Sequence, residues 1–158
     1  MKIIADIFFD LILNFPLMTA LVSMLIAQIL KLIYYYFKDG GLDLTHFIEA
    51  GGMPSAHSAM VSALSVSIGL TIGWASPLFA IAFIFSIVVM YDAMGVRRAA
   101  SKQAYILNKV VDDVYGDAKG KIEKLKEIMG HSPVEVAVGT VLGITIAYAL
   151  YVIIYLRI

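Results

Sequence analysis

The segment PLFAIAFIFSIVVMYDAMGV, residues 77–96, is apolar for almost its whole length and sets the fold class of this protein. A run of about 20 apolar residues is long enough for a helix to cross a bilayer. Helices satisfy their own backbone hydrogen bonds within lipid. Three other stretches approach or exceed this length: Phe15–Phe37, about Ala56–Trp74, which is the shortest, and Pro133–Leu156. We therefore predict an all-α, polytopic membrane helix bundle of about four transmembrane helices plus short amphipathic helices.

The composition agrees with a membrane protein. Of the 158 residues 61% are hydrophobic and 15% are charged, and a soluble domain of this length would carry more charge. We expect one integral membrane domain over residues 1–158, with Met1–Asp10 as a turn of interfacial helix. The absence of cysteine excludes a disulfide framework and a thiolate metal site. The net charge of zero gives no argument for nucleic acid, and we expect no nucleic-acid partner.

The distribution of the basic residues predicts an orientation. With four spans, segments 38–55 and 97–132 lie on one side of the membrane. Ten of the twelve Lys and Arg residues fall on that side, counting Lys31 at the end of its span. Because loops rich in Lys and Arg stay in the cytoplasm, this side is predicted to be cytoplasmic. We expect a multi-pass protein of the bacterial inner membrane.

The segment 97–132 is the one long polar region and is predicted to be a partly helical cytoplasmic insertion. Its apolar residues recur at helical spacing, which indicates two short amphipathic helices broken near Gly116–Gly120. Such helices can lie on the bilayer surface. The alternative is a lid over a site on this face.

Two pairs of glycines with GxxxG spacing occur in the predicted spans, Gly69 with Gly73 and Gly139 with Gly143. Small residues at this spacing let helix backbones approach closely. We expect packing within one chain, and a homodimer interface is the alternative.

Polar and ionisable residues gather at the cytoplasmic ends of all four predicted spans. Ionisable residues at membrane depth are expensive and usually functional. Helix N-termini favour phosphate through their free N–H groups, and cations can clamp a transferring phosphoryl group. The pattern therefore predicts an anion site. Its candidate residues, in chain order, are Lys31, Lys38, Ser55, His57, Asp92, Arg97, Arg98, His131 and Glu135.

Several of these residues also have a purely structural interpretation. Ser132, Pro133 and Glu135 have the spacing of a capping box with proline at the first helical position. Ser55 has the place of an N-cap, and the two arginines that follow the third span could be stop-transfer anchors. Asp92 is harder to explain in this way, because an unpaired carboxylate there costs several kcal/mol, as an order of magnitude.

Three motifs resemble a known superfamily. PSAH, residues 54–57, resembles the P-S-G-H signature of the type-2 phosphatidic acid phosphatases, which are related to the vanadium haloperoxidases. HSPVEVAVG, residues 131–139, is similar to the signature with a nucleophilic histidine and a carboxylate four residues later. KLIYYYFK, residues 31–38, keeps the spacing of the lysine–arginine signature but ends in lysine. The whole pattern, over about residues 15–145, looks most like a smaller, divergent branch of this superfamily.

The sequence departs from the superfamily pattern at two further places. Ala56 replaces the glycine of the P-S-G-H signature, although its backbone N–H remains. Leu125 stands where an arginine is expected six residues before the nucleophile. Arg97 and Arg98 are the candidates to replace that arginine from the end of the third span.

The resemblance implies metal-independent hydrolysis of phosphomonoesters through a phosphohistidine, without a cofactor. His131 would attack phosphorus, Glu135 would orient its ring, and His57 would protonate the leaving oxygen and then help activate water. Asp92 would support the site. The phosphate-binding residues would be Lys31, Lys38, Ser55, Ala56, Arg97 and Arg98.

A site at a membrane interface favours an amphiphilic substrate, a phospholipid or isoprenoid phosphate. The predicted cytoplasmic face suits phosphatidic acid or phosphatidylglycerol phosphate better than the recycling of polyprenyl diphosphates outside the cytoplasm. The competing class is a non-catalytic protein that binds or transports anionic lipids on a degenerate phosphatase fold. Haloperoxidase chemistry with vanadate suits a lipid-facing site poorly.

Overall fold

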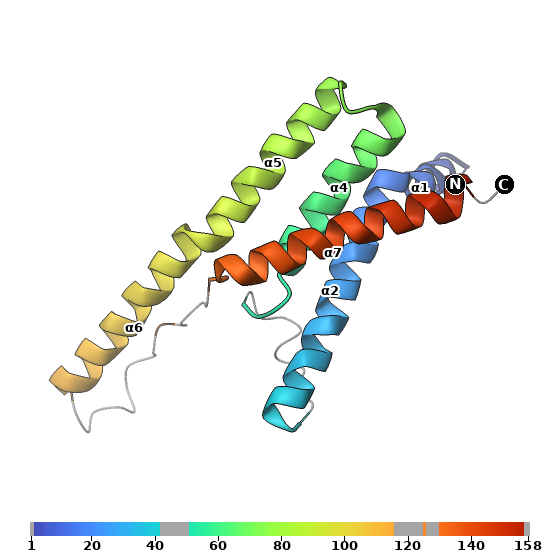
Figure 1. The fold of residues 1–158 in the computed structure, drawn as a ribbon. Coiled ribbons are helices and arrows are strands. Elements are labelled where there is room, and N and C mark those ends of the chain that lie inside the picture. The colour runs from blue at the N-terminus through green and yellow to red at the C-terminus, as the bar shows by residue number, and fades with distance from the viewer. Residues whose placement is uncertain (1, 42–50, 116–124, 126–129, 157–158) are drawn as a thin grey trace.

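The computed structural model describes residues 2–41, 51–115, 125 and 130–156. The elements of this described part are all helical, as the sequence predicts (Figure 1). They are α1 (Lys2–Leu13), α2 (Phe15–Asp39), α4 (Ala56–Ile72), α5 (Pro77–Met94), α6 (Val96–Tyr115), α7 (Pro133–Tyr151) and the π-helical turn η2 (Val152–Leu156).

The long helices begin at capping residues that the sequence supplies. Asn14 accepts a hydrogen bond from the backbone N of Leu17 at 3.1 Å, and Ser76 accepts one from that of Phe79 at 3.2 Å. Each of these two helices, and α7 as well, carries a proline in its first turn, where a missing N–H costs nothing. These signals set where each span starts.

α4 is the central helix of the bundle and packs against α2, α5 and α7. Its buried residues are mostly alanine and serine, and Ala56 and Ala59 pack against Ala27 of α2. Small side chains allow the helix backbones to come close together. The Ser86 hydroxyl of α5 donates to the carbonyl of Val61 at 2.8 Å and ties α5 to α4.

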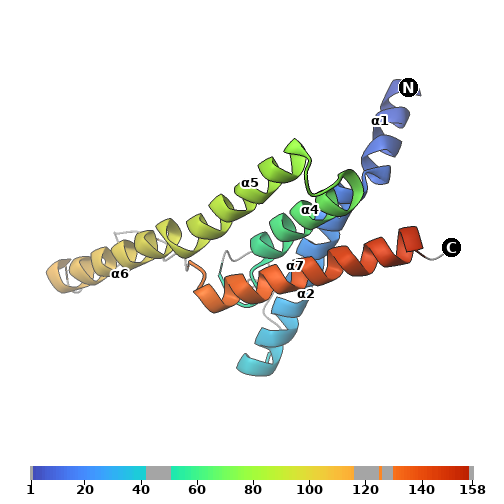
Figure 2. The same ribbon diagram turned by 45° about the horizontal axis from the view of Figure 1, so that its top comes forward.

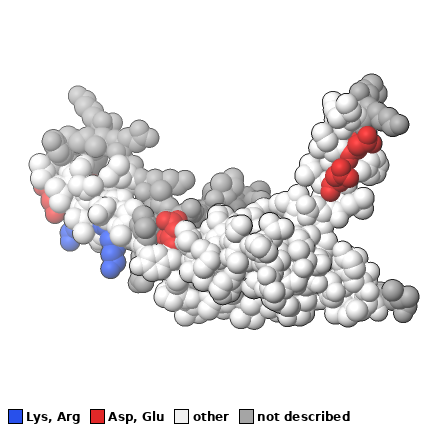
Figure 3. Space-filling view, turned by 90° about the horizontal axis from the view of Figure 1, so that it is seen from above, with Lys and Arg blue, Asp and Glu red and all other residues white. Residues whose placement is uncertain are grey.

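Three helices are long and apolar enough to cross a membrane: Phe15–Lys38, Pro77–Met94 and Pro133–Leu156. This confirms a helical membrane bundle. The stretch predicted as the shortest span forms α4, an apolar helix of only 17 residues surrounded by the other three. In the view of Figure 3 a broad uncharged surface separates the acidic side chains of the projecting α1 from the charged side chains at the opposite end.

One glycine pair packs two helices together within the chain, as expected. A Cβ atom at Gly139 would collide with the carbonyl oxygen of Ser55, and one at Gly143 with that of Ala59, so α7 lies directly on α4. The other pair behaves differently. Gly69 lies against the Trp74 ring, and Gly73 ends α4 with a φ of 112°. That second pair therefore shapes the α4–α5 turn.

The first part of the polar region is a single long helix. α6 has 20 residues and continues almost in line with α5 beyond Gly95, so that it extends away from the other helices (Figures 1 and 2). It ends at Tyr115, next to the predicted break. The second predicted helix lies outside the described residues, except for Leu125. The side-chain amide of Asn108 donates to the carbonyl of Leu125 at 2.8 Å and accepts from its backbone N at 2.9 Å.

Candidate functional site

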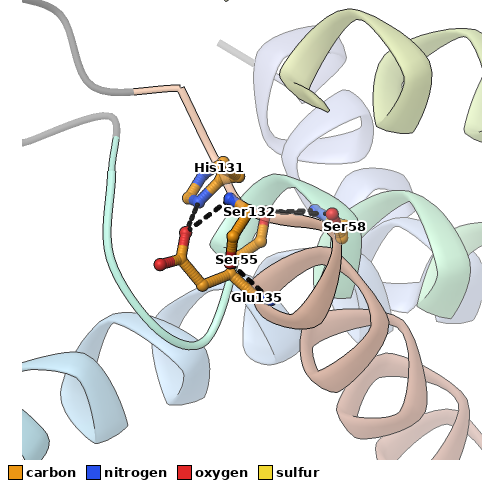
Figure 4. Close-up of polar contacts among 5 residues, drawn as sticks. All are labelled: Ser55, Ser58, His131, Ser132 and Glu135. Carbon is orange, nitrogen blue, oxygen red and sulfur yellow. Dashed lines mark hydrogen bonds and ion pairs between the residues drawn. The ribbon is translucent and has the colours of Figure 1, made fainter. Parts of the chain in front are cut away.

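The N-termini of α4 and α7 meet at one end of the bundle (Figure 4). The backbone N of Ser55, the N-cap of α4, donates to the carbonyl of Glu135 at 3.1 Å. The Ser55 hydroxyl accepts from the backbone N of Ser58 at 3.3 Å and from the Ser58 hydroxyl at 2.9 Å. Ser55 and Ser58 are fully buried. Two helix N-termini, both of which favour anions, are therefore fixed side by side.

Glu135 has both the structural role and the orienting geometry that the sequence suggests. Its Oε2 accepts from the backbone N of Ser132 at 3.1 Å, while the Ser132 hydroxyl accepts from the backbone N of Glu135 at 3.3 Å. These two bonds form the predicted capping box. The same Oε2 lies 3.1 Å from Nδ1 of His131. One carboxylate oxygen thus caps α7 and holds the imidazole ring.

His131 is almost completely buried, with 2% of its surface exposed. Its backbone N donates to the carbonyl of Ala93 in α5 at 3.1 Å. Burial is the largest influence on this histidine and lowers its pKa from the ordinary value. The nearby positive charge of Lys31 lowers the pKa further, whereas Glu135 and a hydrogen bond with the Gly52 backbone oppose this shift. The net effect favours a neutral imidazole.

Lys31 lies on the buried face of α2, with only 2% of its surface exposed, close enough to His131 to affect its charge. One turn further along α2, the Tyr35 ring packs against Gly52. A Cβ atom at Gly52 would lie 2.8 Å from the Tyr35 ring and from its hydroxyl. Gly52 also has a φ of 91°, a conformation that other residues adopt only with strain. Glycine is therefore required where the loop passes the imidazole.

Lys38 lies farther from the buried part of the site. It is exposed in the last turn of α2, and its Nζ lies 5.4 Å from the Tyr35 ring centre and 5.9 Å from that of Tyr34. Seven residues of helix separate it from Lys31, a rise of about 10 Å. Lys31 therefore lies near the imidazole of His131, whereas Lys38 lies beside the rings of Tyr34 and Tyr35.

His57 and Asp92 line a groove between α4 and α5. The groove has a volume of about 340 Å³ and is otherwise apolar. His57 is exposed and Asp92 is half-buried, and both side chains have interaction partners. Ala93 also lines the groove, and its carbonyl is the one that accepts from the backbone of His131. The groove thus begins next to the nucleophile that the sequence suggests.

The other predicted site residues are described by their positions along the helices. Ala56 is buried as the first residue of α4, and its N–H is one of the first-turn N–H groups that have no acceptor within the helix. Arg97 and Arg98 lie at the start of α6, one turn beyond Ala93, and their side chains lie outside the described part. Among the described residues no group of three or more His, Asp and Glu side chains could hold a metal ion.

Sequence reasoning missed Tyr35, Gly52 and Ser58. Tyr35 stands four residues after Lys31 and Ser58 three after Ser55, spacings that put each pair on one helix face. That signal could have found both. No local pattern in the sequence indicates that Gly52 faces Tyr35 and His131, because this contact joins two separate elements.

Comparison with known proteins identifies the family of the chain. The family model described as "Divergent PAP2 family" matches residues 12–146. The chain is 40% identical over 152 aligned positions to "Uncharacterized membrane protein YuiD" of Bacillus subtilis (strain 168), an alignment that covers 89% of this chain and 96% of the relative. No solved structure matches the chain. The chain belongs to the divergent PAP2 family, a membrane-protein branch of the phosphatidic acid phosphatase-related superfamily.

Proposed function

We propose that this protein is a membrane phosphatase that hydrolyses lipid phosphomonoesters through a phosphohistidine on His131. The observation that carries the proposal is the 3.1 Å contact between Oε2 of Glu135 and Nδ1 of His131, beside two helix N-termini. A nucleophile that is oriented by a third group and placed next to anion-binding amides is the arrangement needed for covalent phosphoryl transfer.

In the first step Nε2 of a neutral His131 attacks phosphorus, and the bond from phosphorus to the lipid oxygen breaks. His57 donates a proton to this leaving oxygen. The Glu135 carboxylate accepts a hydrogen bond from the Nδ1–H of His131, which keeps its proton, and so stabilises the positive ring of the phosphohistidine. The lowered pKa of His131 keeps the attacking lone pair available near neutral pH.

In the second step water attacks the phosphohistidine. His57, now neutral, takes a proton from that water, the bond from phosphorus to nitrogen breaks, and inorganic phosphate leaves. The buried charge of Lys31 and the first-turn amides of α4, including that of Ala56, would stabilise the phosphoryl oxygens in both steps. Arg97, Arg98 and Lys38 would add positive charge at the entrance, and Asp92 would support His57.

The substrate is inferred from where the site lies. The N-termini of α4 and α7 lie at one end of the apolar bundle. The exposed rings of Tyr34, Tyr36 and Tyr91 lie near the C-terminal ends of α2 and α5, which point to the same end (Figure 1). Trp74 is exposed at the other end of α5, as in the aromatic belts of membrane proteins. A site at this level would reach the phosphate of a lipid, and the excess of Lys and Arg at this end supports a cytoplasmic orientation.

A non-catalytic protein that binds anionic lipids is the second candidate. One observation favours it. The His131 ring is 2% exposed and hydrogen-bonded to the Gly52 backbone, and this arrangement limits how closely the phosphorus of a substrate can approach the ring. Under this alternative the same amides and Lys31 would hold a headgroup without cleaving it. His131 would then be replaceable.

The test is phosphate release by the purified protein from phosphatidic acid, phosphatidylglycerol phosphate and isoprenyl phosphates, with and without a chelator. His131→Ala is the test variant. His46→Ala is the matched control, because His46 is the one histidine of the sequence that lies outside the three motifs. Release that persists in chelator, survives in the control and is lost in His131→Ala supports the phosphatase. Absence of release by well-folded protein, with retained binding of the same lipids to His131→Ala, supports the second candidate.

A further inference from the structure

We propose that the groove between α4 and α5 holds the hydrocarbon chain of the lipid phosphate. This inference rests on the proposed function and specifies its substrate as a long-chain lipid held by its tail as well as by its phosphate. The groove is lined by His57, Met60, Val61, Phe85, Val88, Val89, Asp92 and Ala93.

The lining has one polar end and one apolar end. α4 runs away from His57 towards Val61, and α5 runs back in the opposite direction from Phe85 to Asp92. His57 and Asp92 therefore lie together at one end, and the lining from there to Phe85 is aliphatic or aromatic. Seven residues of helix correspond to a length of about 10 Å. This polarity matches a lipid whose headgroup lies beside His57 and whose chain points towards the middle of the bundle.

The groove is continuous with the phosphate site. Ala93 lines it, and the carbonyl of Ala93 accepts a hydrogen bond from the backbone N of His131 at 3.1 Å. His57 lies two residues after Ser55, whose backbone is bonded to Glu135. A lipid in the groove would thus bring its phosphate to His131 without leaving the membrane-facing side of the protein.

The chemistry requires the chain to lie on the side of His57. A general acid must stand next to the atom that it protonates, and here that atom is the oxygen that leaves with the lipid alcohol. The hydrocarbon chain is attached to this oxygen through the rest of the alcohol. If His57 is the acid, the chain must extend from His57, and the described groove begins there.

The groove opens to lipid rather than to water. α5 is a candidate span, and most of its side chains are exposed, including Phe85 and Val88. A volume of about 340 Å³ falls at the small end of the range for ligand sites. Burial of a hydrocarbon chain in such an apolar site is favourable, and a small soluble phosphate would gain nothing from it.

Photolabelling tests chain placement independently of catalysis. The probe is phosphatidic acid with a diazirine at mid-chain, in phosphatidylcholine vesicles with the full-length protein, and the comparison probe is phosphatidylcholine with the same diazirine. We expect the phosphatidic acid probe to label the peptides that contain Met60 and Val88 several-fold more than the comparison probe. Equal labelling by both probes would mean that the groove holds bulk lipid only, and the proposal would be wrong.

A matched pair of variants tests whether a bulky side chain in the groove prevents the lipid from binding there. Val88→Phe places a phenyl ring inside it, whereas Ile87→Phe places a phenyl ring at the next position, on a side chain that is also exposed but does not line the groove. We expect Val88→Phe to reduce labelling by the phosphatidic acid probe, and kcat/KM for long-chain phosphatidic acid, by about tenfold. Ile87→Phe should change neither. Equal effects of the two variants would overturn the proposal.

The outcomes separate this proposal from the proposed function. Labelling that is selective for phosphatidic acid in a protein that releases no phosphate would retain the groove and reject catalysis. Hydrolysis that is the same for long-chain phosphatidic acid and for glycerol 3-phosphate, and insensitive to Val88→Phe, would retain catalysis and reject the groove.

Discussion

Oε2 of Glu135 lies 3.1 Å from Nδ1 of His131, one helical turn away, and the same oxygen caps the backbone of the helix that carries Glu135. The cap fixes the carboxylate before any substrate binds, because the backbone N–H of Ser132 is part of the helix start. The imidazole of His131 is therefore held by a carboxylate whose position is fixed when α7 folds. This arrangement links the stability of α7 to the chemistry proposed for His131.

Glu135→Gln should separate these two roles. The amide oxygen of glutamine can still accept from the backbone N of Ser132, so the free energy of unfolding should fall by only about 1 kcal/mol or less. The loss of negative charge removes the stabilisation of a positive imidazole, and we expect phosphate release to fall at least about 100-fold. Thermal unfolding and release from phosphatidic acid measure the two effects. Equal activity in variant and parent would contradict the orienting role.

The pKa of His131 should respond in opposite directions to its two charged neighbours. Lys31→Met removes a positive charge and should raise the pKa, whereas Glu135→Gln removes a negative charge and should lower it. NMR titration of the ring in detergent with labelled histidine measures both without a need for activity. Shifts in the same direction, or no shift in either variant, would show that these charges do not act on the ring.

The lowered pKa also predicts how stability depends on pH. The folded protein binds a proton at His131 less readily than the unfolded chain, in which the pKa is near 6.5. Below about pH 6.5 the unfolded state therefore binds more protons, and the free energy of unfolding should fall as the pH drops towards the folded pKa. Urea unfolding of the parent and of His131→Gln at a series of pH values measures this contribution. The part of the pH dependence of the free energy of unfolding that His131 contributes should be absent in His131→Gln.

Gly139→Ala should loosen the contact between α7 and α4. The new Cβ would collide with the carbonyl oxygen of Ser55, and overpacking of this kind costs about 1–3 kcal/mol. Gly41→Ala is the control, because a Cβ at Gly41 meets nothing within 4 Å. Thermal unfolding should show a lower midpoint for Gly139→Ala alone. Equal midpoints for the two variants would mean that this helix contact contributes little.

Asn108 should hold the backbone at Leu125. Asn108→Ala removes both hydrogen bonds, and Asn108→Asp keeps the acceptor while it removes the amide donor. Hydrogen exchange at the Leu125 amide should therefore speed up strongly in Asn108→Ala and less in Asn108→Asp. Exchange that is unchanged in both would show that other contacts hold this residue.

Much of the fold could be predicted because it depends on local signals. Apolar length marks the spans, and Ser132 followed by Pro133 and Glu135 marks the start of α7, where the capping box indeed forms. The four-residue spacing of Gly139 and Gly143 in the sequence predicted a close contact with another helix. The structure confirms this contact, and the other helix is α4. Each of these features follows from a few adjacent residues, and so a single sequence contains them.

The rest depends on contacts between elements. The structure places Lys31 at the imidazole and Lys38 over aromatic rings, although both fit the spacing of one signature. Which lysine lies inside depends on how α2 rotates against α4 and α7. The groove that contains His57 and Asp92 likewise exists only because α4 and α5 pack side by side.

The central claim is that His131 receives the phosphoryl group, and the most direct test is to detect it there. The protein in phosphatidylcholine vesicles is mixed with phosphatidic acid, quenched at alkaline pH, where phosphohistidine survives, and digested for mass spectrometry. The account predicts a phosphorylated peptide that contains His131 in the parent protein, and no such peptide in His131→Ala. Continued phosphate release by well-folded His131→Ala, with no phosphorylated peptide in the parent, would contradict it.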